Sequence, residues 1–465
     1  MDIAVEPTLI IQLQRMGDLI MTFPLMGWLR ATEPDRPVWV VAEPDFFEAL
    51  MPFAPQAVFF GPDAVPGLVK RRFHRVINLS HRGIGLELAG QVEAESRAGT
   101  FVAGGERHIA GPWQAYRASI VHNNRHNRLH WADLAALDSV PRHILPLTLW
   151  PEARTPQQQG RIGLFVGASE ADKRPEAAFW AELAVQLIRR GYNPVFLGGK
   201  AERALADEAA KQAGIPRSNL AAHFDLEKFS AFIERLDLLV TPDTGPMHLG
   251  GWLGVPTLNL SLGPVNPWET APAAPGVYVL RSEPSCSGCW QCVRERVDGK
   301  PPCHQAFSPQ RIGALIHMLL HQQAQSMALH GLRLLRTARD DRGLFRLEAV
   351  DRHPAGGRDR LDDFWREAFL YLLDGPRPRP EAALGAVREH EPHLVPLLIR
   401  HLSQLIRDLL RGQGSVWLSA PPLLRPFSGY VQMVLENGNT TPQARREAIR
   451  LAEKLLAVLS VHHEC

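Results

Sequence analysis

Residues 8–29, TLIIQLQRMGDLIMTFPLMGWL, decide the fold that we predict for this chain. The run from Thr8 to Leu13 predicts a buried strand, and the apolar stretch from Leu19 to Leu29 predicts a helix. The Gly17-Asp18 pair between them is typical of a tight turn at the start of a helix. The segment therefore predicts a β-turn-α unit of the kind that opens an α/β domain.

The alternation of strands and helices continues along the chain and restarts once. In the first part we predict strands at 38–42 and 75–79 and a helix at 84–92. After a Pro-, Gln- and Arg-rich linker at 148–160, we predict strands at 161–166, 194–197, 236–240 and 255–260, with helices at 176–190 and from Ala201. These patterns predict an α/β protein with two Rossmann-like domains, residues 1–150 and 151–325, that face each other across a cleft.

The pattern changes beyond about Ser308, where strand signals become sparse. Long Leu-, Arg- and Ala-rich stretches favour helices at 312–334, 361–373, 396–410 and 442–459. We therefore predict that residues 326–465 form a mainly helical extension, whose role the sequence does not indicate.

Composition restricts the classes of function. The chain has 465 residues, of which 45% are apolar and 22% charged, so two or three domains are expected. The formal charge of +2 provides no basic field for nucleic acid, so no nucleic-acid partner is predicted. Residues 1–7 lack the features of a secretory signal, and no apolar run of 18 residues could span a bilayer. A cytoplasmic location is therefore expected.

The first candidate site residue is Asp18, which follows the first predicted strand. Ligands of open α/β sheets usually bind at the carboxyl ends of the strands, and Gly17 permits a close backbone approach there. Asp18 can equally be a helix N-cap that only satisfies backbone amides, and the local pattern leaves both interpretations open.

A second candidate site is the turn PDTGPMH at residues 242–248, again between a predicted strand and a helix. Free N–H groups and the helix dipole favour phosphate at such a turn. Thr244 can donate a hydroxyl, Gly245 leaves space, and Asp243 can accept sugar hydroxyls. The alternative is a capped helix with proline in its first turn, and His248 can equally be a satisfied core histidine.

Two further groups follow the strands at 161–166 and 194–197. Ser169 and Lys173 lie in the first of these loops and can bind a diphosphate, although a loop lysine is often only solvated. Glu202 follows the second strand, where a carboxylate commonly meets ribose hydroxyls. The GGK sequence at residues 198–200 is not a complete dinucleotide fingerprint, so NAD binding is not supported.

Together these motifs resemble one family, glycosyltransferase family nine, whose type members are the ADP-heptose:lipopolysaccharide heptosyltransferases. The resemblance covers roughly residues 8–325. It depends on QLQRMGD with TFP at 12–24, on the Lys173 loop, on DTGPMHL at 243–249 leading to GVP at 254–256, and on GP with NPW at 263–268.

The resemblance implies a GT-B fold, in which the first domain binds the acceptor and the second binds the nucleotide sugar. It implies that Asp18 is the catalytic base, that Lys173 and Thr244 contact the diphosphate, that Glu202 contacts the ribose and that Asp243 contacts the sugar. Gly17, Ser169, Gly245 and His248 complete the expected donor site. Asp18 would deprotonate an acceptor hydroxyl that attacks the anomeric carbon with inversion, and no metal would be required for catalysis.

The partners implied by the resemblance are ADP-heptose or a similar nucleotide sugar and a lipid-linked saccharide of the lipopolysaccharide core. Such an acceptor implies peripheral contact with the cytoplasmic face of the inner membrane. Two alternatives remain open: a transferase that uses another nucleotide sugar on a protein or capsule precursor, and a catalytically silent protein that only binds nucleotide sugars.

Four of the five cysteines gather in the later part of the second predicted domain, at Cys286, Cys289, Cys292 and Cys303. Four soft ligands at this density in a reducing compartment favour a structural Zn or Fe site. The alternative is a set of ordinary, unligated thiols.

Overall fold

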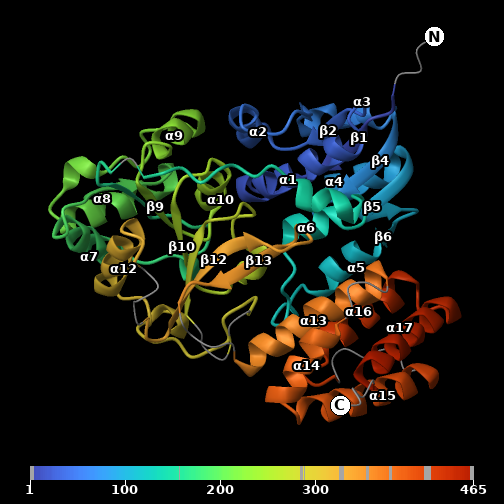
Figure 1. Ribbon diagram of the computed structural model, residues 1–465. Coiled ribbons are helices and arrows are strands. Elements are labelled where there is room, and N and C mark those ends of the chain that lie inside the picture. Colours follow the sequence, from blue (N-terminus) through green and yellow to red (C-terminus); the bar gives the residue numbers. More distant parts are fainter. Residues whose placement is uncertain are drawn as a thin grey trace.

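The computed structural model describes residues 5–156, 158–282, 286, 289–323, 329–351, 356–375, 380–412 and 420–460. Two α/β lobes lie next to each other, the first in blue and cyan and the second in green and yellow in Figure 1. A bundle of helices, drawn in orange and red, packs against the first lobe (Figure 1). The prediction of two Rossmann-like domains with a helical extension is confirmed.

The first lobe contains a six-stranded sheet in the order β3-β2-β1-β4-β5-β6, in which only β6 is antiparallel to its neighbour. Its strands are β1 (Thr8–Ile11), β2 (Val38–Val41), β3 (Val58–Phe60), β4 (Arg72–Asn78), β5 (Glu93–Ala103) and β6 (Glu106–Ala110). Its helices are α1 (Met16–Thr32), α2 (Pro44–Leu50), α3 (Val65–Leu68), α4 (Gly83–Gln91), α5 (Pro112–Ser119) and α6 (Trp131–Ala136), with 3-10 turns η1 (Pro62–Ala64) and η2 (Arg142–Leu147).

The first strand explains the layering of this lobe. Side chains alternate between the two faces of a strand. Leu9 and Ile11 therefore point to the face covered by α4, in one apolar cluster with Leu88. Ile10 points to the opposite face and joins the cluster of α1 with Phe23. Both faces are buried, which is why the strand is almost uniformly apolar.

The second lobe contains a seven-stranded sheet in the order β13-β12-β11-β10-β9-β7-β8, parallel from β8 to β11 and antiparallel at β12 and β13. Its strands are β7 (Arg161–Phe165), β8 (Asn193–Leu197), β9 (Leu238–Pro242), β10 (Thr257–Ser261), β11 (Tyr278–Ser282), β12 (Leu332–Arg339) and β13 (Phe345–Ala349). Its helices are α7 (Ala177–Ile188), α8 (Arg203–Gln212), α9 (Leu226–Ile233), α10 (Gly245–Trp252), α11 (Pro267–Thr270) and α12 (Pro309–Leu320). The 3-10 turns are η3 (Ala171–Lys173), η4 (Lys200–Glu202), η5 (Pro216–Ser218) and η6 (Pro302–His304).

The helix expected over residues 312–334 differs from the structure. Helix α12 ends at Leu320, and Leu332 begins β12, which pairs with the edge of β11. Gly331 has a φ of +75°, a conformation that glycine adopts without a steric penalty, and it precedes the strand. Pairing supplies partners for the exposed backbone groups of β11, a tertiary effect that helical periodicity does not register.

The helical extension shares its core with the first lobe. It consists of α13 (Gly357–Asp374), α14 (Glu381–His390), α15 (Leu394–Leu410), α16 (Arg425–Asn437) and α17 (Pro442–Ser460). The Tyr116 ring of α5 lies 4.5 Å from the ring of Phe369 and 6.4 Å from that of Tyr430, centroid to centroid. The Asn437 side chain also forms two hydrogen bonds, of 2.7 and 2.9 Å, with the backbone of Ile109 on edge strand β6. Among the described residues, no helix is long and apolar enough to cross a membrane.

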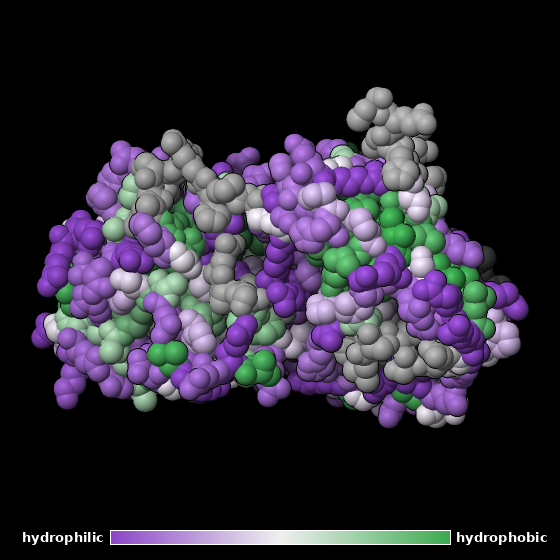
Figure 2. Space-filling model, turned by 90° about the horizontal axis from the view of Figure 1, so that it is seen from below, coloured by the Kyte–Doolittle hydropathy of each residue, from purple (hydrophilic) through white to green (hydrophobic). Residues whose placement is uncertain are grey.

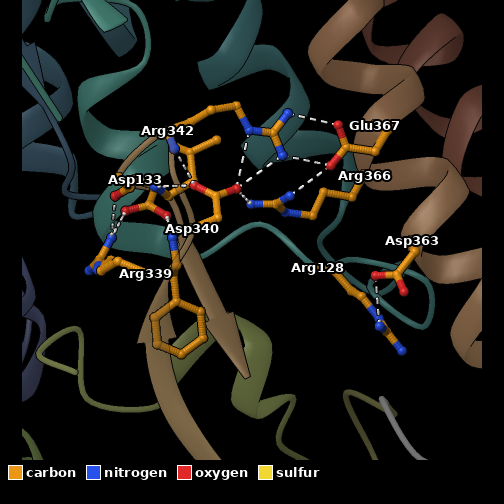
Figure 3. A network of polar contacts seen from close by, with 11 residues as sticks. Arg128, Asp133, Arg339, Asp340, Arg342, Asp363, Arg366 and Glu367 are labelled. Carbon is orange, nitrogen blue, oxygen red and sulfur yellow. Dashed lines mark hydrogen bonds and ion pairs between the residues drawn. The ribbon is translucent and has the colours of Figure 1, made fainter. Parts of the chain in front are cut away.

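The turn between β12 and β13 connects the second sheet to both the first lobe and the extension (Figure 3). On one side Asp133 of α6 accepts hydrogen bonds from the Arg339 guanidinium at 2.5 Å and from the Phe345 N–H at 2.7 Å. On the other side Asp340 accepts hydrogen bonds from Arg366 of α13 at 2.8 Å and from Arg342. The turn therefore joins three parts of the molecule through buried charges.

The surface has little contiguous apolar area to suggest a membrane-embedded face. Figure 2 shows mainly hydrophilic residues, with hydrophobic ones in small patches. Large exposed apolar side chains include the neighbouring Leu147 and Leu149, at 68% and 96% exposure, and Leu410, at 69% exposure, which is distant from them in the sequence. Scattered apolar residues of this kind are normal for a protein surface.

We predict that Asp340→Asn destabilises the protein strongly. The substitution leaves the Arg366 guanidinium, whose side chain is 1% exposed, without its full countercharge. Removing one partner of a buried ion pair costs about 3–5 kcal/mol. Glu447→Gln is the matched control, because it breaks an exposed pair with Arg450 that is worth less than about 1 kcal/mol. In urea denaturation, Asp340→Asn should have a clearly lower midpoint than Glu447→Gln. Equal midpoints would show that the buried pair of Asp340 and Arg366 does not stabilise the protein more than the exposed pair does.

Candidate functional site

The first helices after β1 and β9 meet end to end between the lobes. A Cβ atom added to Gly17 would lie 2.8 Å from Cδ2 of His248, and one added to Gly245 would lie 2.2 Å from Cε of Met16. The position of Gly17 therefore favours glycine, because the His248 ring in the way of a side chain is buried, whereas the atom in the way at Gly245 is the end of the flexible Met16 side chain. The N-termini of α1 and α10, with their free N–H groups and positive dipole ends, consequently lie next to each other.

Asp18 lies in the first turn of α1, at the edge of this contact. Its Oδ2 accepts a hydrogen bond from the Arg15 N–H at 3.2 Å; Arg15 is the N-cap residue, so Asp18 stabilises the first turn from within the helix and is not the N-cap that the simpler interpretation expected. Burial raises the pKa of Asp18, and the charges of Arg117 and Arg15 partly oppose the rise. A half-buried carboxylate with a raised pKa is suited to accept a proton, so capping does not exclude catalysis.

Asp243 lies at the end of β9 and interacts electrostatically with Asp18. Burial raises its pKa to about 6, the negative charge of Asp18 adds to the rise, and Lys173 opposes it. Its Oδ1 also accepts a 3.4 Å hydrogen bond from the hydroxyl of Thr270. The structure therefore brings the two predicted carboxylates and Lys173 together, with one carboxylate from each lobe.

Lys173 lies in the turn η3 that follows β7, beside the exposed Ser169. Its ammonium lies 3.1 Å from Glu170 Oε1. A Cβ atom on Gly263, whose φ is +75°, would lie 2.2 Å from the backbone oxygen of Asp172, so this turn packs tightly against the loop after β10. The tight contact holds Lys173 at the carboxyl end of the second sheet.

Glu202 lies across the carboxyl ends of β7 and β8. Its Oε2 accepts a 2.9 Å hydrogen bond from the Gly199 N–H. A Cβ atom added to Gly167 or Gly198 would lie 2.4 or 2.7 Å from carbons of the Glu202 side chain. These glycines provide the space that places the carboxylate where a nucleoside would meet this sheet edge.

Thr244 and His248 belong to the same turn but face different surroundings. Thr244 is the N-cap residue of α10 and makes no capping bond through its side chain, so its hydroxyl remains available. Burial and the neighbouring His130 lower the pKa of His248 to about 3, which keeps the ring neutral. The His248 ring packs against Gly17. This position favours a packing role between the lobes, and the expected donor contact of His248 stays a prediction.

Two buried asparagines of the first lobe bind a glutamate of the second. We call residues 122–130 the bridging segment. Within it Asn124 and Asn127 donate hydrogen bonds of 2.7 and 2.9 Å to the carboxyl group of Glu269 in α11. Burial raises the pKa of Glu269 to about 8, although these amides oppose the rise. A neutral carboxyl group is therefore the prevailing form at pH 7, and it avoids an unpaired charge between the lobes.

The bridging segment also binds the helical extension. The His126 ring lies 2.6 Å from Asp362, and Arg128 donates a 2.8 Å hydrogen bond to Asp363, both on α13 (Figure 3 labels Arg128 and Asp363). Sequence reasoning missed this segment, because its Asn, His and Arg residues match no motif. Its only signal was an unusual density of polar side chains that turned out to be buried.

The predicted metal site is not supported by the structure. Cys286, Cys289, Cys292 and Cys303 are free thiols, and the described residues contain no group of three or more His, Cys, Asp or Glu side chains arranged to hold a metal ion. The thiols do lie in one region: burial raises the pKa of Cys289, and its neighbour Cys286 contributes to the rise. Three of the four line a small hollow beside the buried Arg281. Since the geometry does not fit a metal, we assign no role to one here.

Comparison with known proteins gives a consistent relationship over part of the chain. Residues 127–296 match the family described as Glycosyltransferase family 9 (heptosyltransferase). Lipopolysaccharide heptosyltransferase 1 of Pseudomonas aeruginosa is 29% identical over 167 residues, which are 33% of this chain and 46% of that protein. Lipopolysaccharide heptosyltransferase 2 of Salmonella typhimurium is 31% identical over 170 residues, 35% of this chain and 47% of that protein.

A solved structure shows the same fold. The E. coli ADP-heptose LPS heptosyltransferase II structure aligns with a TM-score of 0.50 and 21% identity, over 68% of this chain and 99% of that one. The match over residues 127–296 confirms the resemblance to family nine for that part of the chain, and the aligned structure confirms the predicted fold of two Rossmann-like lobes. The chain spans about half the length of the two curated relatives that it matches. Asp18 lies outside the matched residues 127–296, so its role is inferred from the geometry of the site and not from the family match.

We predict that Gly17→Ala impairs the protein whereas Gly27→Ala in the same helix does not. The added methyl group at Gly17 would overlap the His248 ring and separate the helix ends, but nothing lies within 4 Å of a Cβ atom at Gly27. Alanine at Gly27 should stabilise the helix by up to about 1 kcal/mol. Thermal unfolding and nucleotide affinity should both be measured. Indistinguishable behaviour of the two variants would show that the close contact is not required.

Proposed function

Because the second lobe resembles family nine, we propose that this chain is an inverting glycosyltransferase that moves a heptose or related sugar from an ADP-sugar to a lipopolysaccharide-core saccharide. One observation carries the proposal: the Asp18 carboxylate of the first lobe lies beside the Asp243-Thr244 turn of the second, where the N-termini of α1 and α10 meet. A proton acceptor and an anion site are thus adjacent, each on its own lobe.

The proposed reaction is a single displacement at the anomeric carbon. Asp18 takes the proton from an acceptor hydroxyl as that oxygen forms the new glycosidic bond. The bond between the anomeric carbon and the diphosphate oxygen breaks, and the nucleoside diphosphate leaves with the electron pair. Attack from the face opposite the leaving group inverts the configuration.

The second lobe would bind and stabilise the leaving group. The N–H groups at the start of α10, the Thr244 hydroxyl and the Lys173 ammonium are suited to the diphosphate. Gly245 leaves space there, Ser169 can donate a further hydrogen bond, Glu202 can accept ribose hydroxyls and Asp243 can accept sugar hydroxyls. We propose that these groups are sufficient and that catalysis needs no metal ion.

The proposed acceptor also defines where the enzyme works. A lipid-linked core saccharide lies at a membrane surface, so we propose a cytoplasmic protein that contacts the inner membrane peripherally. The names of the curated relatives, lipopolysaccharide heptosyltransferases 1 and 2, support this acceptor class over a protein or capsule precursor.

Asp18→Asn should lower transfer by about a hundred- to ten-thousandfold, because it removes the general base and retains the shape of the side chain. Affinity for ADP should stay nearly unchanged, since the second lobe holds the nucleotide. Asp45→Asn, an exposed carboxylate in the first turn of α2, is the matched control.

The pH profile of the wild-type enzyme provides a second test of Asp18. A base with a raised pKa is lost as the pH falls, and Asp243 beside it takes up a proton at about pH 6. The apparent pKa at which kcat/KM decreases on the acid side should therefore lie above the usual range for a carboxyl group. It should reflect the coupled titration of Asp18 and Asp243. Near-normal turnover of Asp18→Asn would remove Asp18 from the mechanism and favour a different base, whereas absence of transfer by the wild-type protein would favour the catalytically silent alternative.

Lys173→Ala should weaken binding of ADP and slow transfer, whereas Lys228→Ala, which removes an exposed lysine of the same lobe paired with Asp225, should do neither. Activity should also persist in EDTA, because cationic and N–H groups of the protein stabilise the diphosphate. Calorimetric titration measures the affinity for ADP, and transfer assays with and without EDTA measure the rate. A requirement for added magnesium together with an inert Lys173→Ala variant would refute this part of the mechanism.

A further inference from the structure

The turn that carries Lys173 is held by a loop that lies more than a hundred residues later in the chain. We call residues 289–305, between β11 and α12, the cysteine-rich loop. Its Arg296 donates two hydrogen bonds of 2.8 Å, one to each carboxylate oxygen of Asp172. Asp172 immediately precedes Lys173 in the turn η3. A bidentate pair of this kind fixes the orientation of both side chains.

The same loop also binds the backbone of that turn. Nε2 of His304 lies 2.8 Å from the backbone oxygen of Asp172. A carbonyl oxygen can only accept, so this ring nitrogen is the donor. From another direction, a Cβ atom on Gly263 would lie 2.2 Å from the same oxygen. Asp172 is therefore held through its side chain and its backbone, between the loop after β10 and the cysteine-rich loop.

The cysteine-rich loop has the internal structure that such a contact needs. Val297 and Lys300 exchange two backbone hydrogen bonds, of 2.9 and 3.0 Å, which close a tight turn beside Arg296. The Lys300 ammonium lies 2.8 Å from Oε2 of Glu176, the N-cap residue of α7. The loop thus contacts the chain on both sides of Lys173.

These contacts determine where the Lys173 side chain starts. Its ammonium is a compact charge on a flexible four-carbon stem, so the backbone position limits which atoms it can reach. Lys173 is 18% exposed in its side chain and lowers the pKa of Asp243, which places its charge beside the proposed donor site. A displacement of the backbone at Asp172 would move that charge away from the site.

We propose that Arg296 and His304 are positioning residues for donor binding: by holding Asp172 they place the Lys173 ammonium against the diphosphate of the nucleotide sugar. Both residues act through Lys173. The inference depends on the proposed function, because it takes Lys173 as a ligand of the diphosphate. It also gives the cysteine-rich loop a role in donor binding.

The first test measures ADP affinity calorimetrically in Arg296→Ala and His304→Ala. The Kd for ADP should rise about two- to fivefold in each, the size expected for one exposed ion pair or one hydrogen bond. His304→Gln retains an N–H donor on a side chain of similar reach and should recover most of the affinity. Arg189→Ala is the matched control, because Arg189 is an exposed arginine of the same lobe at the far end of α7. Unchanged affinity in both alanine variants, or an equal loss in Arg189→Ala, would overturn the inference.

A double-mutant cycle with Lys173→Ala distinguishes positioning from general damage to the lobe. If Arg296 acts through Lys173, adding Arg296→Ala to Lys173→Ala should change the Kd for ADP by less than about twofold, because the group that it positions is already absent. The same result is expected for His304→Ala in the Lys173→Ala background. Fully additive losses of affinity would show that the two residues act elsewhere, and would overturn the inference.

ADP binding needs no acceptor, so these measurements separate the inference from the proposed function. The expected affinities and coupling would support the positioning role even if the wild-type protein transferred no sugar, an outcome that would refute the proposed function alone. Transfer by the wild-type protein, together with ADP affinity that depends on Lys173 but not on Arg296 or His304, would refute the positioning role alone. A wild-type protein that does not bind ADP would refute both.

Discussion

The arrangement of the site depends on the contact between Gly17 and Gly245. The ends of α1 and α10 can approach closely because Gly17 has no Cβ atom, which would overlap the buried His248 ring of α10. Each helix presents its positive end to the same small region, and each brings one carboxylate to it, Asp18 and Asp243. Burial raises the pKa of both carboxylates, and the charge of Asp18 raises that of Asp243 further, so the contact also affects the acid–base properties of the site. A side chain at Gly17 would change the distance and the electrostatics together.

The relative position of the lobes is fixed by polar contacts outside the glycine contact. The bridging segment binds Glu269 of the second lobe and Asp363 of the extension, and the turn between β12 and β13 binds Asp133 and Arg366. Buried charges and amides of this kind are directional, and they are costly to separate when no new partner is available. The extension therefore helps to fix the relative position of the two lobes. It binds the bridging segment and the turn between β12 and β13, through which the first lobe contacts the second.

The sequence predicted those parts of the molecule that depend on local pattern. Apolar periodicity was sufficient for β1 and α1, and the order of the motifs was sufficient to identify Lys173, Glu202 and Asp243 as candidates. It could not predict β12, because that strand is stabilised by its pairing with β11. Nor could it identify Arg117, which reaches the site only through tertiary packing. The metal prediction for the cysteines has no support among the described residues, because ligand spacing does not determine whether four thiols converge with the right geometry.

Division of the site between two lobes has a consequence for how rate depends on structure. In the proposed reaction, general-base catalysis and leaving-group stabilisation act on opposite sides of the same reacting carbon, so the lobe that holds Asp18 and the lobe that holds Thr244 would have to keep a fixed separation. Displacements of about 1 Å between reacting groups can reduce rate a hundredfold. The polar contacts of the bridging segment and of the β12–β13 turn lie outside the reacting groups, yet they maintain that separation. The residues that determine the rate therefore include those that hold the lobes together, far from the proton that is transferred.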